Sequence, residues 1–381
     1  MSGESRTGAP GGPPDGAEAA RTADGDEAAT VRPREGSTLH YALLWTAAEA
    51  RERFLARLGL VVALSRTLDH VHDRGVAERK VHWWHEELER LRAGEPRHPR
   101  TVACAGPLAG LEAANAACLD VLSVAATTRY TPPADDAERR ARLVRDHGAR
   151  LALLAHALSG RAADLEEPDI RNPGLAFALG LHETLARLPT LLHRGFAVFS
   201  DADYARHGLS PVALAREVRR RPEHGETDEE AGGETSREGG RDRDRGESRG
   251  EASGKASPGA RLSGIPVVAA PPERGPMIAA SVAAARRALD DALADPAYRA
   301  TYSRRELAPL ARIAAIRARQ LRLWQEQAPD LLRENVTPTP LAKLLVAWRH
   351  RRGAPRPRPS RDGRDPGADS GPDSGPDSGH G

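Results

Sequence analysis

The sequence predicts an all-α protein, and three observations carry that prediction. Ala, Leu, Arg and Glu, which favour helices, dominate the parts of the chain that can fold. Apolar residues recur there every three to four positions, as they do on one face of a helix. Alternating runs of the kind that form strands are nearly absent. We therefore expect a bundle of eight or more helices.

The first helices can be placed from their apolar faces and their end signals. Leu55, Leu58 and Val62 lie on one face of a long helix that is expected to run toward His72. A second helix is predicted over 76–91 because glycine and proline follow it at 94 and 96. The same periodicity predicts further helices over 100–126, 135–160, 173–192 and 340–352.

Two local signals refine the later helices. Pro189 lacks a backbone N–H and should break the helix predicted over 173–192. Ser303 and Glu306 have the spacing of a capping box, which predicts a helix start at that point. The apolar face that follows, from Leu310 to Trp324, belongs to the helix that they would begin.

Composition divides the chain into one folding domain and three segments that cannot pack. Residues 1–37, 221–262 and 353–381 are rich in Gly, Pro and charged residues and poor in large apolar ones. They cannot bury enough surface to offset the entropy of ordering, so we predict disordered arms and a disordered insertion. The remaining chain from 38 to 352 is long enough for one large helical domain, which the insertion interrupts.

Charge and cysteine content exclude several classes of protein. Lys and Arg number 56 and Asp and Glu 54, so a dedicated nucleic-acid partner is not expected. Two cysteines are too few for a disulfide framework or a closed zinc site, which fits a reducing compartment. No apolar run approaches the roughly 18 residues of a membrane span. We expect a cytoplasmic protein, or one that is peripheral at the inner membrane surface.

One segment carries residues suited to metal chemistry. Arg66, Asp69 and Asp73 fall at i, i+3 and i+7 and would share one face if the segment is helical. Two carboxylates one turn apart can hold Mg²⁺, which prefers oxygen ligands and keeps positions for phosphate oxygens. Carboxylate pairs at this spacing are also common on solvated helix faces, so the spacing alone is a weak signal.

The residues around this segment resemble the squalene/phytoene synthase family. KVHWWHEEL at 80–88 and GEPRHP at 94–99 are similar to the family's K-x-x-W-W-x-x-E-L and G-x-P-x-H-P motifs. YALL at 41–44 precedes the first aspartate segment, and Arg194-Gly195 with HGLS at 207–210 resembles a later one. The similarity spans 38–215 and 266–352 and is most specific in its first half.

The resemblance implies an isoprenoid-synthase-like fold, in which helices surround a central apolar cavity. In active relatives, Mg²⁺ bridges two facing aspartate-rich helices to the diphosphates of two prenyl donors. Asp69 and Asp73 would be the metal ligands and catalytic residues of the first helix. The substrate-binding residues implied by the same resemblance are Tyr41, Arg66, Arg187 and Arg194.

The second aspartate motif of the family is missing. Alignment on Arg194 places Arg187 and Leu191 where the family has its two aspartates, and neither residue can ligate Mg²⁺. The family's tyrosine segment is also lost near 146–148. LARLP at 185–189 is similar to the L-R-x-x-P segment of a non-catalytic branch, the phytoene-synthase-like assembly factors of respiratory complex I. The sequence is therefore expected to be a degenerate member of the family.

Two questions stay open from the sequence. Arg187 could pair with Asp69 and Asp73 in place of the metal bridge, or Arg66, Arg187 and Arg194 could bind an anionic head group. The favoured function is a non-catalytic or weakly catalytic protein that binds a prenyl diphosphate, a lipid, a respiratory-complex subunit or a membrane surface. The alternative is a Mg²⁺-dependent transferase that condenses two prenyl diphosphates head to head.

Overall fold

The computed structural model describes residues 31–219, 274–333 and 335–354. Within these ranges every regular element is a helix and no strand occurs, so the predicted all-α class is confirmed. Residues 31–37 lead without helical structure into the first helix, which begins at Thr38. The predicted insertion at 221–262 and nearly all of the two predicted arms lie outside the described residues.

The helices follow one another with short connections. They are α1 (Thr38–Leu43), α2 (Ala48–Ser65), α3 (Arg74–Ala93), α4 (Pro99–Val102), α5 (Ala105–Leu108), α6 (Glu112–Tyr130), α7 (Asp136–Ser159), α8 (Pro168–Arg171), α9 (Pro173–Ala186), α10 (Leu188–His193), α11 (Asp201–Arg206), α12 (Pro211–Arg219), α13 (Arg274–Ala294), α14 (Pro296–Tyr302), α15 (Ala308–Gln327) and α16 (Pro340–Arg349). Two short 3₁₀ segments occupy Ala162–Leu165 and Arg305–Leu307.

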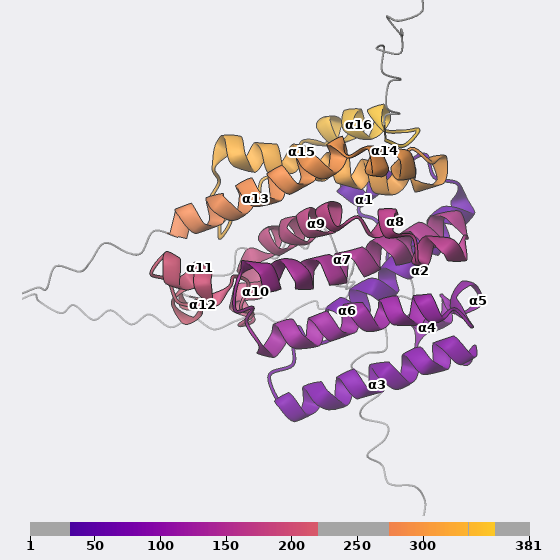
Figure 1. The fold of residues 1–381 in the computed structure, drawn as a ribbon, viewed down its shortest axis with the longest axis horizontal. Coiled ribbons are helices and arrows are strands. Elements are labelled where there is room, and N and C mark those ends of the chain that lie inside the picture. Colours follow the sequence, from indigo (N-terminus) through magenta and orange to yellow (C-terminus); the bar gives the residue numbers. More distant parts are fainter. Residues whose placement is uncertain (1–30, 220–273, 334, 355–381) are drawn as a thin grey trace, which may run out of the picture.

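The long helices lie in a stack. Figure 1 shows α3 at one end, then α6, α7, α9 and α13, with α15 at the other end, and each packs on its neighbour. Helix α2 packs against α6 and α7, and α16 packs against α15 and α1. The short helices α10, α11 and α12 gather at one end of the stack, near the C-terminal end of α9.

Two apolar clusters form the core. The larger one joins α7, α9, α13 and α15 and includes Phe54, Phe177 and Trp324. The smaller one fills the space between α2, α3, α6 and α7 and includes Trp84 and Leu122. Both arise because each long helix places its apolar stripe between two neighbours.

Several predicted helix boundaries are confirmed. Helix α3 ends at Gly94, which adopts a left-handed conformation with φ 83° that favours glycine. The break predicted at Pro189 is present, because α9 ends at Ala186 and α10 begins at Leu188. Proline then lies in the first turn of α10, where no intrahelical partner is needed for its missing N–H.

The first predicted helix is shorter than expected. Helix α2 ends at Ser65 with Arg66 as its C-cap, and the chain then runs through turns to Asp73. Gly75, which follows this segment, lies in the first turn of α3. The expected shared helix face of Asp69 and Asp73 is therefore wrong, since the two residues do not belong to one helix.

Two other expectations also need correction. The predicted helix over 100–126 is divided among α4, α5 and α6, and Gly110, with φ 75°, separates the last two. The capping box at Ser303 does not form: this residue is the C-cap of α14, and its hydroxyl donates to Ala300 O. Helix α15 begins five residues later because Pro309 fits only in a first turn.

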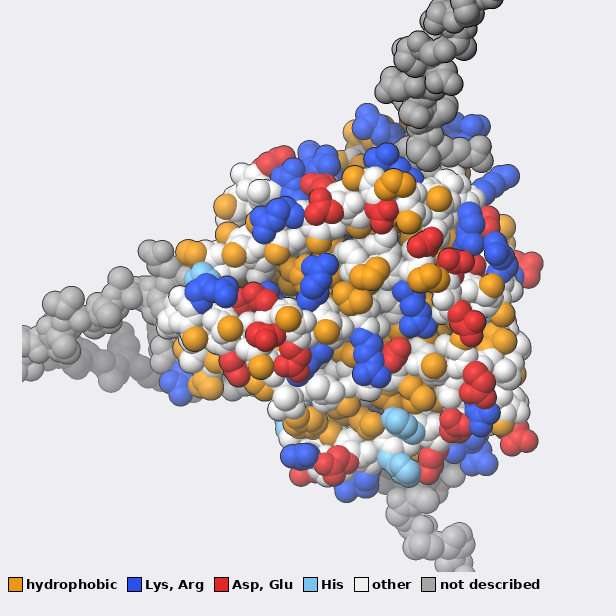
Figure 2. Space-filling model, viewed as in Figure 1, with side chains coloured by type: hydrophobic (Ala, Val, Ile, Leu, Met, Phe, Trp, Pro, Cys, Tyr) orange, Lys and Arg blue, Asp and Glu red, His pale blue; other side chains and the backbone are white. Residues whose placement is uncertain are grey.

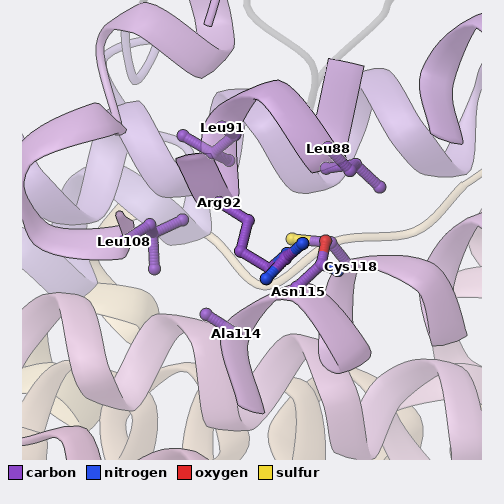
Figure 3. A pocket seen from close by; sticks show the side chains of 7 residues that line it. All are labelled: Leu88, Leu91, Arg92, Leu108, Ala114, Asn115 and Cys118. Atoms are coloured by element: carbon purple, nitrogen blue, oxygen red, sulfur yellow. The ribbon is translucent and has the colours of Figure 1, made fainter. Parts of the chain in front are cut away.

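Two hollows among the described residues bear on the predicted central cavity. One of about 10 Å³, shown in Figure 3, lies between α3, α5 and α6 and is lined by Leu88, Leu108 and Cys118. The other, of about 300 Å³, lies beside Phe196 and the start of α12. Neither hollow is lined by Asp69, Asp73 or Arg187. The predicted central cavity therefore stays a prediction. No helix among the described residues has the length and apolar character of a transmembrane span.

Candidate functional site: an ion-pair cluster around Asp69

Asp69 is held in a buried turn after α2. Its side chain is only 5% exposed, and its backbone N–H donates to Arg66 O at 3.0 Å. Leu68 and Thr67, the two preceding residues, are buried and anchor the turn. A carboxylate in such a position requires compensating donors, because burial without them costs several kcal/mol.

Two arginines from the two ends of α10 supply those donors. Arg187, at the junction of α9 and α10, places Nη2 3.0 Å from Asp69 Oδ2. Arg194, the C-cap of α10, places Nη1 2.6 Å from the same oxygen. The predicted pair between Arg187 and Asp69 is therefore present, and Arg194 completes it.

The ion pairs continue from Arg187 into the bundle. Glu183 lies one turn earlier on α9, with Oε1 3.7 Å from Arg187 Nη1. Arg150 on α7 donates to Glu183 Oε2 at 3.0 Å and to Asp146 Oδ2 at 2.6 Å. Burial raises the pKa of Glu183, but Arg150 and His147 outweigh it and hold that pKa well below its ordinary value.

His147 closes this network from α7. Its Nε2 lies 3.2 Å from Glu183 Oε2, and its Nδ1 lies 3.2 Å from Asp146 Oδ2. Burial and Arg150 lower the pKa of His147, but the two carboxylates outweigh them and raise it above its ordinary value. The residues joined in this way form the Asp69 cluster: Asp69, Asp146, His147, Arg150, Glu183, Arg187 and Arg194.

Gly180 allows the close approach of α7 and α9 that this network needs. A Cβ at this position would lie 2.8 Å from His147 Nδ1 and 3.1 Å from Leu143 Cδ2. A real Cβ could not come so close, so the imidazole would have to move. No signal in the sequence indicates this role of Gly180, because the glycine lies inside an ordinary apolar helical segment.

Arg129, at the end of α6, connects the turn after α2 to the C-terminal end of α10 by donating to backbone carbonyl groups. Its guanidinium donates to Val71 O at 3.1 and 3.0 Å and to Arg194 O at 2.7 Å. It also lies 4.8 Å from the ring centroid of Phe196. Sequence reasoning missed this residue, and no local pattern distinguishes it from other arginines.

The other residues implied by the resemblance lie outside the cluster or only border it. Asp73 is exposed and caps α3 by accepting from Val76 N at 2.8 Å. Arg66 lies in the same turn as Asp69 as the C-cap of α2. Tyr41 lies on α1, which packs against α15 and α16, and no hydrogen bond among the described residues joins it to Asp69.

These positions do not fit Mg²⁺. One oxygen of Asp69 accepts from two guanidinium groups, and Asp73 is engaged in capping a different helix. Leu191, half-buried against the larger apolar cluster, offers no ligand atom. Among the described ranges, no group of three or more His, Cys, Asp or Glu side chains is placed to hold a metal. In this arrangement guanidinium groups neutralise the Asp69 carboxylate.

The tryptophan motif has a structural explanation. Glu87 is fully buried and accepts from Arg97 N at 2.7 Å and from His98 N at 2.8 Å. The ring of His98 then contacts those of Trp83 and Trp84 at centroid distances of 5.7 and 5.0 Å. These contacts fix the turn between α3 and α4.

The two cysteines are unsuited to nucleophilic or metal chemistry. Both are free and buried, and Cys118 lines the small hollow of Figure 3. Burial raises the pKa of Cys118 to about 12 and also raises that of Cys104, although Arg57 acts in the opposite direction. Both thiols are therefore protonated at neutral pH and cannot act as thiolates.

The larger hollow adjoins the Asp69 cluster. Its walls are the turn from Gly195 to Ala197 and one side of α12, including Val212 and Ala215. Arg216 is its one charged lining residue among those described. An apolar hollow of about 300 Å³ with one cation at its rim is at the lower limit for a small-molecule site.

No protein-family model matches the chain, and no curated protein matches it in sequence. Membership of the squalene/phytoene synthase family is therefore a proposal. It rests on the motif residues and on the arrangement around Asp69.

Proposed function

We propose that this chain is a member of the squalene/phytoene synthase family in which an arginine–carboxylate bridge replaces the metal bridge of the active enzymes. Its function is then binding or assembly, as in the complex I assembly factors that its sequence resembles. The observation that carries this proposal is the double ion pair of Asp69 with Arg187 and Arg194.

The chemistry of the cluster supports a non-catalytic role. Ionisation of an allylic diphosphate needs cations placed where negative charge develops on the leaving group. In this chain, Arg187 and Arg194 already neutralise Asp69, and Arg187 also lies near Glu183. The positive charges of both arginines are paired with carboxylates of the protein, so they are poorly placed to stabilise a departing diphosphate.

The hollow beside Phe196 supports a prenyl or lipid ligand. Its apolar lining suits an isoprenoid or acyl chain, and Arg216 suits the phosphate of the head group. In this proposal the Asp69 cluster fixes the position of α10, and α10 leads into the turn that forms one wall of the hollow. A ligand bound there would require no metal.

The activity test uses the full chain with farnesyl or geranylgeranyl diphosphate and Mg²⁺. We expect no squalene-type or phytoene-type hydrocarbon above the level given by the Asp69→Asn variant. A hydrocarbon product that requires both Mg²⁺ and Asp69 would establish the alternative, a head-to-head prenyltransferase, and would overturn the proposal.

The binding test uses calorimetry with farnesyl diphosphate in the presence of EDTA. We expect binding without Mg²⁺ that weakens about tenfold in Arg216→Gln, the loss of one charge-assisted contact. Arg74→Gln, on an exposed arginine of α3, is the matched control. Binding that needs Mg²⁺, or that is equally weak in both variants, would contradict this part of the proposal.

A further inference from the structure

Helix α16 exposes an apolar stripe. Leu341, Leu344, Leu345 and Trp348 follow the i, i+3, i+4, i+7 spacing of one helix face, and they are between 36% and 65% exposed. The opposite face is turned inward, since Ala347 and Lys343 are buried. The helix therefore packs on the bundle through one side and leaves a second apolar side uncovered in the described chain.

Two further apolar residues border this stripe. Leu44 and Trp45 follow α1, which packs against α16, and both are exposed. Buried Arg312 joins the two elements: its guanidinium donates to Arg351 O at 2.8 Å and lies 5.3 Å from the ring centroid of Trp45. We call this surface the α16 patch; it consists of Leu44, Trp45, Leu341, Leu344, Leu345 and Trp348.

The charged residues on α16 and immediately beside it in the sequence have one sign. The sequence from 335 to 352 contains no acidic residue, whereas the whole chain is nearly balanced at +2. Arg349, Arg351 and Arg352 are exposed at its C-terminal end, and Arg351 lies 4.7 Å from the ring centroid of Trp348. In Figure 2, Lys and Arg side chains gather along the upper edge, where Figure 1 places α15 and α16.

The segments nearest in sequence are poorly suited to cover this stripe. Residues 1–30 and 355–381 contain no Val, Ile, Leu, Phe, Tyr or Trp. Helix α16 has ten residues, or about 15 Å of helix, which is half the thickness of a bilayer core. An apolar face with a basic rim on so short a helix suits a position parallel to a membrane surface.

We infer that the α16 patch binds the surface of an anionic phospholipid bilayer. Leucine side chains enter the boundary between head groups and acyl chains, and Trp45 and Trp348 lie at the level of the head groups. Arg349, Arg351 and Arg352 attract the lipid phosphates. This inference concerns a different surface from the Asp69 cluster and does not depend on the proposed function.

The experiment is co-sedimentation of the full chain with vesicles of phosphatidylcholine alone or with 30% phosphatidylglycerol, a composition of about one anionic lipid in three. We expect binding only to the anionic vesicles and weakening as salt rises. The Leu345→Gln/Trp348→Ala variant should bind at least about tenfold more weakly, because it removes two inserted side chains. Arg349→Gln/Arg351→Gln/Arg352→Gln should bind about 100-fold more weakly.

A matched control separates the patch from exposed apolar residues in general. Val76→Gln/Val102→Gln changes two comparably exposed apolar residues outside the patch and should bind as wild type does. Thermal unfolding checks that each variant is folded. The inference is overturned if anionic vesicles bind nothing, or if the control loses as much binding as the patch variant. It is also overturned if sedimentation velocity shows that Leu345→Gln/Trp348→Ala abolishes self-association, which would make the patch an interface between copies.

Discussion

Arg187 Nη2 lies 3.0 Å from Asp69 Oδ2, although 118 positions separate the two residues. The contact joins the turn after α2 to the junction of α9 and α10. Arg194 reaches the same carboxylate oxygen from the other end of α10. A buried carboxylate is thereby neutralised by two guanidinium groups that are each about one-fifth exposed.

Asp69 should matter for stability far more than Asp73. We expect Asp69→Asn to lower the free energy of unfolding by about 2 kcal/mol, because two partly buried guanidinium groups lose their shared anion. Asp73→Asn should change it by less than about 0.5 kcal/mol, since asparagine caps a helix as well as aspartate does. Urea unfolding measures both values. Equal effects of the two substitutions would show that the ion pair does not stabilise the fold.

Glu87 should be essential to the turn between α3 and α4. Burial raises its pKa, but donors that include His98 N and Thr101 Oγ1 outweigh this and lower it. We expect Glu87→Gln to destabilise the protein by about 3 kcal/mol, because an amide N–H₂ would face these donors. Glu86→Gln, on the neighbouring exposed residue, should cost less than about 0.5 kcal/mol. Similar thermal midpoints for the two variants would refute this role.

Gly180 should not tolerate a methyl group. Alanine normally stabilises a helix by about 1 kcal/mol relative to glycine. At Gly180 the added Cβ would meet His147 Nδ1 at 2.8 Å, so we expect Gly180→Ala to be destabilising by about 1–3 kcal/mol. Gly106→Ala is the control, because a Cβ added there would meet nothing within 4 Å. A stabilising effect of Gly180→Ala would mean that α7 and α9 lie farther apart.

Stability should fall as the pH is lowered from about 6.5 to about 4. Burial, followed by Arg57, lowers the pKa of His156 to about 4. Arg57 Nη1 lies 3.5 Å from His156 Nδ1, which suits a neutral imidazole. The unfolded state, with an ordinary pKa near 6.5, binds the proton first, so protonation favours unfolding throughout this interval.

This pH dependence can be assigned with two variants. We expect His156→Gln to flatten the loss of stability between pH 6.5 and pH 4, which amounts to about 3 kcal/mol for this group. His147→Gln should act above pH 6.5 instead, because the raised pKa of His147 gives stability that is lost as pH rises through it. Chemical denaturation across pH measures both slopes. An unchanged slope below pH 6.5 in His156→Gln would refute the assignment.

Signals that act within one turn of the chain predicted much of the fold. Gly94 ends α3 because a left-handed residue is needed there, and Pro189 forces a new helix because it lacks a donor. By contrast, the end of α2 at Ser65 carries no glycine or proline. The helix ends there because distant segments bury Leu68 and Asp69 in the turn that follows. A local sequence pattern cannot predict contacts with distant segments.

The candidate site was predictable only in part. Arg187 stood out because a cation occupied a position where the resemblance implies an aspartate. Arg129 and Arg150 gave no such signal, since arginine is frequent throughout this chain. Their contacts with Arg194 O and Glu183 join positions that are 65 and 33 residues apart. Asp73 was misplaced because the turn after α2 separates it from the face that it was expected to share with Asp69.

The most direct test of the central claim is the coupling free energy between Asp69 and Arg187. It is obtained from the unfolding free energies of wild type, Asp69→Asn, Arg187→Gln and the double variant. An ion pair between Asp69 and Arg187 predicts a coupling free energy of about 1–2 kcal/mol. The double variant should then be destabilised by less than the sum of the two single substitutions. A coupling within about 0.3 kcal/mol of zero would contradict it, because the two residues would then act independently.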